Sequence, residues 1–139
     1  SSGRWGAPRQ VWNHPNRSAW SPDGRALVCA WTDGIWLIPV NGGSLRQAYP
    51  LPEGITGQDA NAKFSRDGGA IYVKVMDHSG RGSFWEIPTT GGRPRLLVRF
   101  DDPTKPSYRF AWASDGRRFF FTINDRQSDI YVAELEGLK

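Results

Sequence analysis

Cysteine and histidine are nearly absent from this sequence of 139 residues, and their scarcity excludes two kinds of site. The single cysteine, Cys29, cannot form a disulfide within the chain. Because it lies in an apolar run, we expect a buried thiol that packs as a small hydrophobic side chain. One cysteine and two histidines do not supply the ligands of a usual zinc site. The sequence therefore predicts no metal site and no cofactor.

Long apolar runs and export signals are missing as well. No run approaches the roughly 18 apolar residues that cross a bilayer, so we expect no membrane insertion. The first residues, Ser1-Ser2-Gly3, lack the basic and then apolar order of a signal peptide. The residues alone therefore assign no compartment to the chain.

The motifs of common catalytic sites are also missing. The sequence has no Gly-x-Ser-x-Gly elbow, no Walker loop and no Gly-x-Gly-x-x-Gly. Asp77, His78 and Ser79 are triad residue types in succession. Adjacent residues cannot fold back into the geometry of nucleophile, base and orienting carboxylate, so we interpret this run as coincidence. We expect no catalytic residues and no enzymatic activity in this chain.

Positive charge exceeds negative charge, but it is dispersed. The net charge is +4, and arginine supplies 14 of the 18 basic residues. A basic surface is compatible with an anionic partner. Because the arginines are scattered along the chain, the sequence favours a solvated surface over nucleic-acid binding.

Three copies of one repeat organise the chain. An aromatic residue followed by x-x-Asp-Gly recurs at Trp20, Phe64 and Trp112, with spacings of 44 and 48 residues. A second aromatic landmark recurs at Trp36, Trp85 and Tyr131. Asp-Gly favours a tight turn, and the flanking apolar segments read as the two strands of a hairpin. The sequence therefore predicts an all-β chain of short antiparallel strands.

Further turns and strands complete the repeat. Asn41-Gly42-Gly43 and Thr90-Gly91-Gly92 predict second turns, which are followed by fourth strands at 45–49 and 95–100. Residues 4–12 align with 92–97, so we expect the chain to begin with a lone fourth strand and to end after a third. The predicted organisation is a single β-propeller segment over 1–139, with a lone outer strand (1–15), blade 1 (16–50), blade 2 (60–102) and blade 3 without its outer strand (107–139).

The run Ser21-Pro22-Asp23-Gly24 and the strand Ile35-Trp36-Leu37-Ile38-Pro39 with Gly42-Gly43 resemble the TolB-like repeat, a WD40-like β-propeller family. The resemblance covers essentially the whole chain and implies four-stranded blades. It implies a bacterial protein in a periplasmic or other extracytoplasmic location. Arg66 and the pair Ala113-Ser114 depart from the pattern, and we expect neither departure to disturb the Asp-Gly turn.

Three blades do not close a propeller, since known rings have about four to eight. Two arrangements remain open. The chain is a fragment of a larger propeller, or two chains form a six-bladed homodimeric ring in which the lone strand of one completes the third blade of the other.

The candidate binding residues are cations on strand starts and loops. Arg17, Lys63 and Arg109 lie at the starts of the inner strands, where they could attract a carboxylate or phosphate near the axis. Arg81 and Arg126 lie in connections between second and third strands, on the face opposite the Asp-Gly turns, where binding residues usually occur. The alternative is that these cations pair with acids or point into water.

Three functions are compatible with these features. The leading hypothesis is a non-enzymatic binding or scaffold module that recognises a protein, a peptide or a small anionic ligand on the loop face. The second is the non-catalytic propeller part of a hydrolase that resembles prolyl oligopeptidase. The third is a structural repeat assembly without a ligand.

Overall fold

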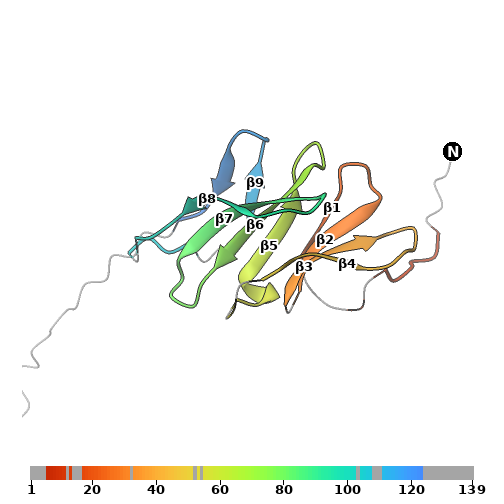
Figure 1. The fold of residues 1–139 in the computed structure, drawn as a ribbon, viewed down its shortest axis with the longest axis horizontal. Coiled ribbons are helices and arrows are strands. Elements are labelled where there is room, and N and C mark those ends of the chain that lie inside the picture. Colours follow the sequence, from red (N-terminus) through yellow and green to blue (C-terminus); the bar gives the residue numbers. More distant parts are fainter. Residues whose placement is uncertain are drawn as a thin grey trace, which may run out of the picture.

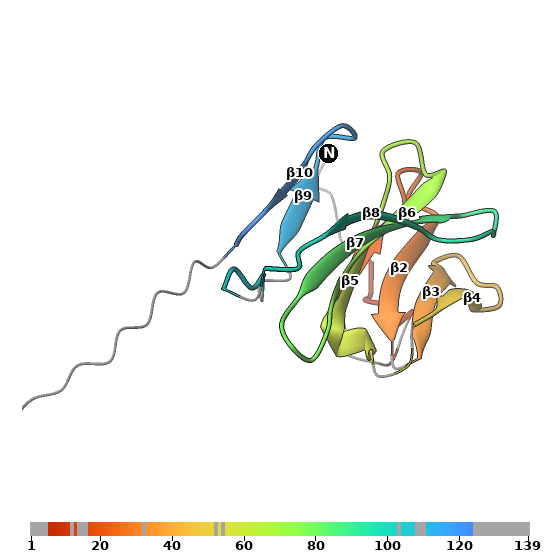
Figure 2. The same ribbon diagram turned by 60° about the vertical axis from the view of Figure 1, so that its left-hand side comes forward.

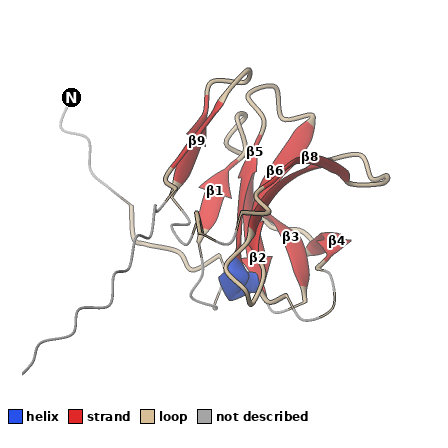
Figure 3. Cartoon of the chain, turned by 90° about the vertical axis from the view of Figure 1, so that its left-hand side faces the viewer, coloured by secondary structure: helices blue, strands red, loops and turns tan. Residues whose placement is uncertain are grey.

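The computed structural model describes residues 6–11, 13, 17–31, 33–51, 53, 55–102, 104–107 and 111–123. This part of the chain is all-β, with one short 3-10 turn (Figure 3). The first sheet contains β1 (Ser18–Trp20), β2 (Ala26–Trp31), β3 (Gly34–Pro39) and β4 (Arg46–Pro50). After the 3-10 turn η1 (Gly57–Asp59), the second sheet contains β5 (Ala60–Phe64), β6 (Ala70–Met76), β7 (Gly82–Pro88) and β8 (Arg95–Arg99). The third sheet is a hairpin of β9 (Trp112–Ser114) and β10 (Phe119–Phe121).

The first two repeats fold alike. Each sheet has its four strands in chain order, and every neighbouring pair is antiparallel. Pro39 and Pro88 close β3 and β7, as expected for a residue that cannot donate to a strand ladder. A register shift recurs at one equivalent place, between Ile35 and Trp36 and again between Phe84 and Trp85. The predicted four-strand order is thus confirmed for these two repeats (Figure 1).

The Asp-Gly turns of the first two repeats share a hydrogen-bond pattern centred on a serine. The Ser65 hydroxyl donates to Asp67 Oδ1 at 2.6 Å and accepts from the backbone N–H of Ala70 at 2.9 Å. Ser21 makes the same two bonds, to Asp23 at 2.6 Å and from Ala26 at 2.9 Å. The side chain therefore fixes the register in which Phe64 pairs with Ile71, and Trp20 with Leu27.

The third repeat has a different turn. Ala113 occupies the place of the serine, so no hydroxyl is present to accept from the equivalent N–H of Arg118. That N–H donates to Asp115 Oδ1 instead, at 2.7 Å, and the hairpin closes between Asp115 and Arg118. Trp112 consequently pairs with Phe121, two positions beyond Phe119. The expectation that Ala113-Ser114 leaves the turn unchanged is wrong.

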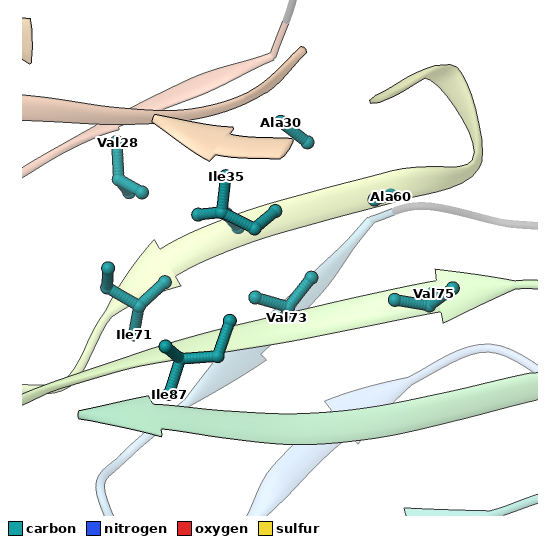
Figure 4. Close-up of a cluster of buried hydrophobic side chains, with 9 residues drawn as sticks. Val28, Ala30, Ile35, Ala60, Ile71, Val73, Val75 and Ile87 are labelled. Carbon is teal, nitrogen blue, oxygen red and sulfur yellow. The ribbon is translucent and has the colours of Figure 1, made fainter. Parts of the chain in front are cut away.

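The first and second sheets pack face to face through aliphatic side chains. Figure 4 shows Val28, Ala30 and Ile35 of the first sheet pointing toward the side chains of the second. The second sheet contributes Ala60, Ala62, Ile71, Val73, Val75 and Ile87, all of them buried. Strand alternation places these residues on one side of each sheet, and together they form a buried apolar core between the two sheets.

The hairpin β9–β10 packs on the opposite face of the second sheet (Figure 2). Phe84 is fully buried there, and its ring centroid lies 4.9 Å from that of Phe119, 5.3 Å from that of Phe121 and 5.4 Å from that of Trp112. The sheets thus stack in chain order, one after another. Among the described residues they do not close into a ring.

The structure describes only part of the two predicted terminal strands, at 1–15 and 124–139. Residues 6–11 form no strand, although Arg9 donates to the carbonyl oxygen of Val40. An outer strand forms only when a neighbouring strand supplies its ladder partners. The rest of 1–15, apart from Asn13, and residues 124–139, where the last third strand is predicted, lie outside the described residues.

Candidate functional site

Of the three predicted inner-strand cations, the structure describes Arg17 and Lys63. Arg17 is exposed directly before β1. Lys63 is half-buried, its amine donates to the carbonyl oxygen of Trp112, and it lies 5.0 Å from the centre of the Trp112 ring. Lys63 therefore links the second sheet to the hairpin. Arg109 and Arg126 lie outside the described residues.

The β6–β7 connection holds the predicted loop residue Arg81 in a fixed place. Asp77 Oδ1 accepts from the backbone N–H groups of Ser79 and Arg81, at 2.9 and 3.0 Å, and from the Ser79 hydroxyl at 2.6 Å. Burial alone would raise the pKa of Asp77, but the hydrogen bonds from Ser79 and Arg81 outweigh it and lower that pKa below its ordinary value. Asp77 is therefore a stable anion that organises the loop.

The Arg81 guanidinium is tethered through one of its three nitrogens. Its Nε donates to Asp77 Oδ2 at 3.1 Å and to the Ser79 hydroxyl at 2.8 Å. Its two terminal nitrogens make no hydrogen bond to any described residue, and the side chain is 51% exposed. Such an arginine presents two parallel N–H donors in an orientation that is already set.

A polar hollow of about 260 Å³ lies in front of Arg81. Arg99, at the end of β8, and Asp101 line it together with Ser83 and Ile55. Neither Arg99 nor Asp101 forms an ion pair or a side-chain hydrogen bond with the described part of the chain. The hollow therefore offers charged groups of both signs to a ligand.

An apolar slot of about 90 Å³ adjoins this hollow, and the two share Val75 and Trp85. Side chains of both sheets line the slot: Ile35, Tyr49, Leu51, Val73, Ile87 and Pro94. The Trp85 indole N–H donates to the Ser83 hydroxyl at 2.9 Å, which fixes the shared wall. We call the hollow and the slot together the amphipathic groove. The hollow lies at the ends of β6 and β8, on the side of the β4–β5 and β6–β7 connections, and the slot extends from there between the two sheets toward Ile87 and Pro94.

Sequence reasoning identified Arg81 but not Trp85 or Arg99. Trp85 recurs with the repeat, a pattern that is typical of a core residue, and it does pack against the apolar cluster. Arg99 is one of several arginines in its region of the sequence, and no local pattern distinguishes it. Its position as the last residue of a strand that ends on the loop face was the available signal.

A buried lysine and serine form a second cluster, between the second sheet and the hairpin. Lys74 Nζ donates to the Ser107 hydroxyl at 2.7 Å and to the Ser107 carbonyl oxygen at 3.1 Å. Both residues are at most 1% exposed, and burial lowers the pKa of Lys74 to about 8. The Ser107 hydroxyl donates to the carbonyl oxygen of Thr122 at 2.8 Å. The pair therefore joins the two elements, and a substrate has no access to it.

The described residues contain neither a cluster of metal ligands nor a helix that could cross a membrane. No group of three or more His, Cys, Asp or Glu side chains there could hold a metal ion. No helix in the same part of the chain has the length and apolar character to cross a membrane.

Comparison with known proteins finds one similar sequence of unstated activity. No family model matches the chain. It is 28% identical over 138 residues to an uncharacterized protein of Agrobacterium fabrum (strain C58 / ATCC 33970), Atu1656. The match covers 93% of this chain and 44% of that protein, so the chain spans less than half of its relative's length. The comparison assigns no activity to this chain.

Proposed function

We propose that this chain is a non-enzymatic binding module of the β-propeller type, and that its ligand occupies the amphipathic groove on the loop face. The observation that carries the proposal is the Arg81 guanidinium, which is tethered through Nε while its terminal nitrogens make no hydrogen bond to a described residue, and which lines the hollow that shares two side chains with the apolar slot. A group that is pre-oriented and unpaired binds a partner at a lower entropic cost than a mobile one.

The polar clusters support binding rather than catalysis. Among the described residues, the one close serine–lysine pair is Ser107 and Lys74, which is buried and hydrogen-bonded to the backbone. A general base must come within hydrogen-bond reach of a substrate, and here the packing of the hairpin prevents that. In the groove itself, Ser83 accepts a bond from Trp85 and makes no side-chain hydrogen bond to Asp77 or Asp101, the described carboxylates that line the same hollow.

The stacking of the sheets supports the propeller part of the proposal. Phe64 packs against the aliphatic cluster that the second sheet shares with the first, and Trp112 packs against Phe84 of the second sheet. The equivalent residue of the first repeat, Trp20, has no preceding sheet among the described residues and is 62% exposed. A further blade would cover it.

We propose that a second copy of the chain supplies that blade, in a homodimeric ring. Phe120, on the outer side of the hairpin, is 51% exposed and would pack on the partner's first sheet. Light scattering after size exclusion should give twice the chain mass of 15.6 kDa. Trp20→Glu should yield the monomer, whereas Leu45→Glu, at a turn residue that is 45% exposed, should not. A monomeric wild-type chain would contradict the dimer and favour a longer propeller, for which the length of the Agrobacterium relative leaves room.

The binding function is tested by exposing the immobilised chain to a random peptide library and analysing the retained and released peptides by mass spectrometry. We expect retention of a subset of the peptides without cleavage. Arg81→Gln should reduce retention, and Arg118→Gln should not. Arg118 forms a similar loop ion pair, with an N–O distance of 3.0 Å to Asp115, but does not line the groove. Cleaved peptides, or equal loss in both variants, would contradict the proposal.

A further inference from the structure

We propose that the amphipathic groove binds the C-terminal end of a peptide whose last side chain is a small aliphatic group. The inference rests on the binding function proposed above and names the chemical class of its ligand. It combines three features of the groove: a pre-oriented guanidinium, a closely adjoining apolar slot and a polar hollow wider than one carboxylate.

The carboxylate part of the inference follows from Arg81. Its Nε is occupied by Asp77 and Ser79, so the free edge of the guanidinium is the one that carries the two terminal nitrogens. A carboxylate matches two parallel N–H donors in a bidentate pair. The tether to Asp77 fixes this edge before the ligand arrives, and Arg99 adds a second cation without a partner in the described structure.

The net charge of the hollow selects among anions. Asp77 and Asp101 line the same hollow as the two arginines, so its formal charge is zero. A dianion such as phosphate loses more hydration free energy on binding than a monoanion does, and a hollow with no excess positive charge does not offset that loss. The arrangement therefore favours a single carboxylate.

The aliphatic part of the inference follows from the size and lining of the slot. It measures about 90 Å³, and its walls are almost entirely apolar side chains of the two sheets. A cavity of about 150 Å³ holds a benzene molecule, so this slot suits a branched aliphatic side chain better than an aromatic one. Val75 and Trp85 belong to both spaces, so the slot borders the same two side chains as the hollow that the arginines line.

A peptide fits the groove better than a free fatty or amino acid does. The hollow of about 260 Å³ is larger than a carboxylate requires. Ser83 and Asp101, which has no ion-pair partner among the described residues, line the remaining space, where a carboxylate oxygen can accept the N–H groups of a peptide backbone. These groups have no counterpart in a simple aliphatic acid.

The test uses fluorescence anisotropy with a short labelled peptide that ends in leucine and a free carboxylate. The C-terminal amide of the same peptide and a version that ends in aspartate should each bind at least about tenfold more weakly, because each loses one charge-assisted or apolar contact. Arg81→Gln and Arg99→Gln should weaken binding of the free acid, while Arg118→Gln should not. Thermal unfolding of each variant verifies that it is folded.

The outcomes separate this inference from the function on which it rests. Equal affinity for the acid and the amide would overturn the C-terminal assignment, while the binding function would stand. Displacement of the peptide by 4-methylpentanoate at equal concentration would overturn the peptide in favour of a free carboxylate. If the leucine peptide and the random library both fail to bind, the proposed function fails together with the inference.

Discussion

The two faces of the second sheet make contacts of opposite character. Its face toward the first sheet is aliphatic, and the buried cluster there contains no charged side chain. Its face toward the hairpin carries Lys63, Lys74 and Phe84, and both lysine amines reach backbone carbonyl oxygens of the segment that includes the hairpin. Because neighbouring residues of a strand point to opposite sides, β5 and β6 contribute to both interfaces at once.

The second sheet holds the first sheet and the hairpin by different kinds of interaction. Aliphatic packing is not directional and tolerates small shifts. Hydrogen bonds to Trp112 and Ser107, and edge contacts such as the 89° pair of Tyr72 and Phe119, depend strongly on orientation. The first interface is therefore held by packing without a fixed direction, and the second fixes one orientation of the hairpin.

Phe84→Ala should produce the largest loss of stability, because it removes the central side chain of the interface between the second sheet and the hairpin. The ring is fully buried and contacts Phe100, Trp112, Phe119 and Phe121. Removing it should cost about 3–5 kcal/mol of the free energy of unfolding, measured in urea. Hydrogen exchange should show that β9 and β10 lose protection first.

The matched control is Ile35→Ala, a buried aliphatic side chain of the other interface. It should also destabilise the chain, by about 2–5 kcal/mol, but leave the protection of the hairpin relative to the second sheet unchanged. If both variants lower protection of the hairpin equally, the two interfaces are not independent and the comparison fails.

The Asp-Gly turns offer a smaller test. Ser65→Ala removes a hydroxyl that is 7% exposed and leaves the Ala70 N–H without its acceptor, so it should cost about 1–2 kcal/mol. The reverse change, Ala113→Ser, supplies the missing hydroxyl in the third repeat. Backbone NOEs should then move the partner of Trp112 from Phe121 toward Phe119. An unchanged register in Ala113→Ser would show that the serine does not set it.

Much of the fold follows from local patterns in the sequence. Asp-Gly and Gly-Gly turns at regular spacing predicted the antiparallel order, and Pro39 and Pro88 lie at strand ends as expected. The turn of the third repeat could not be predicted from Asp-Gly alone. Its register depends on a serine hydroxyl two positions before the aspartate, a contact that is visible only when three turns are compared.

The candidate site was less predictable, because it joins residues from separate strands. Arg81 was predicted from its loop, but its orientation depends on the contact of its Nε with Asp77, which the sequence does not reveal. Lys63 was predicted on the correct strand, yet alternation does not reveal which segment covers that face. In the β7–β8 ladder Trp85 pairs with Leu96 and Arg99 pairs with Ser83, on either side of a register shift that sequence spacing alone does not locate.

Lys74 provides the smallest and most specific test, through pH. Burial holds its pKa at about 8 against an ordinary 10.5, so between these values the unfolded chain binds a proton that the folded chain does not. The free energy of unfolding should therefore rise from about pH 8, by at most about 1.4 kcal/mol per pH unit. Lys74→Met should lack this rise. Burial raises the pKa of Cys29 from 9.0 to about 11, so between these values the folded chain keeps a proton that the unfolded chain loses. This lowers the free energy of unfolding as pH rises. Stability should therefore fall above pH 9 in Lys74→Met, and it should not fall there in a Cys29→Ala control. If the free energy of unfolding of the wild-type chain does not rise between pH 8 and 9, the Lys74 amine is hydrated. The interface between the second sheet and the hairpin then contains no buried charge.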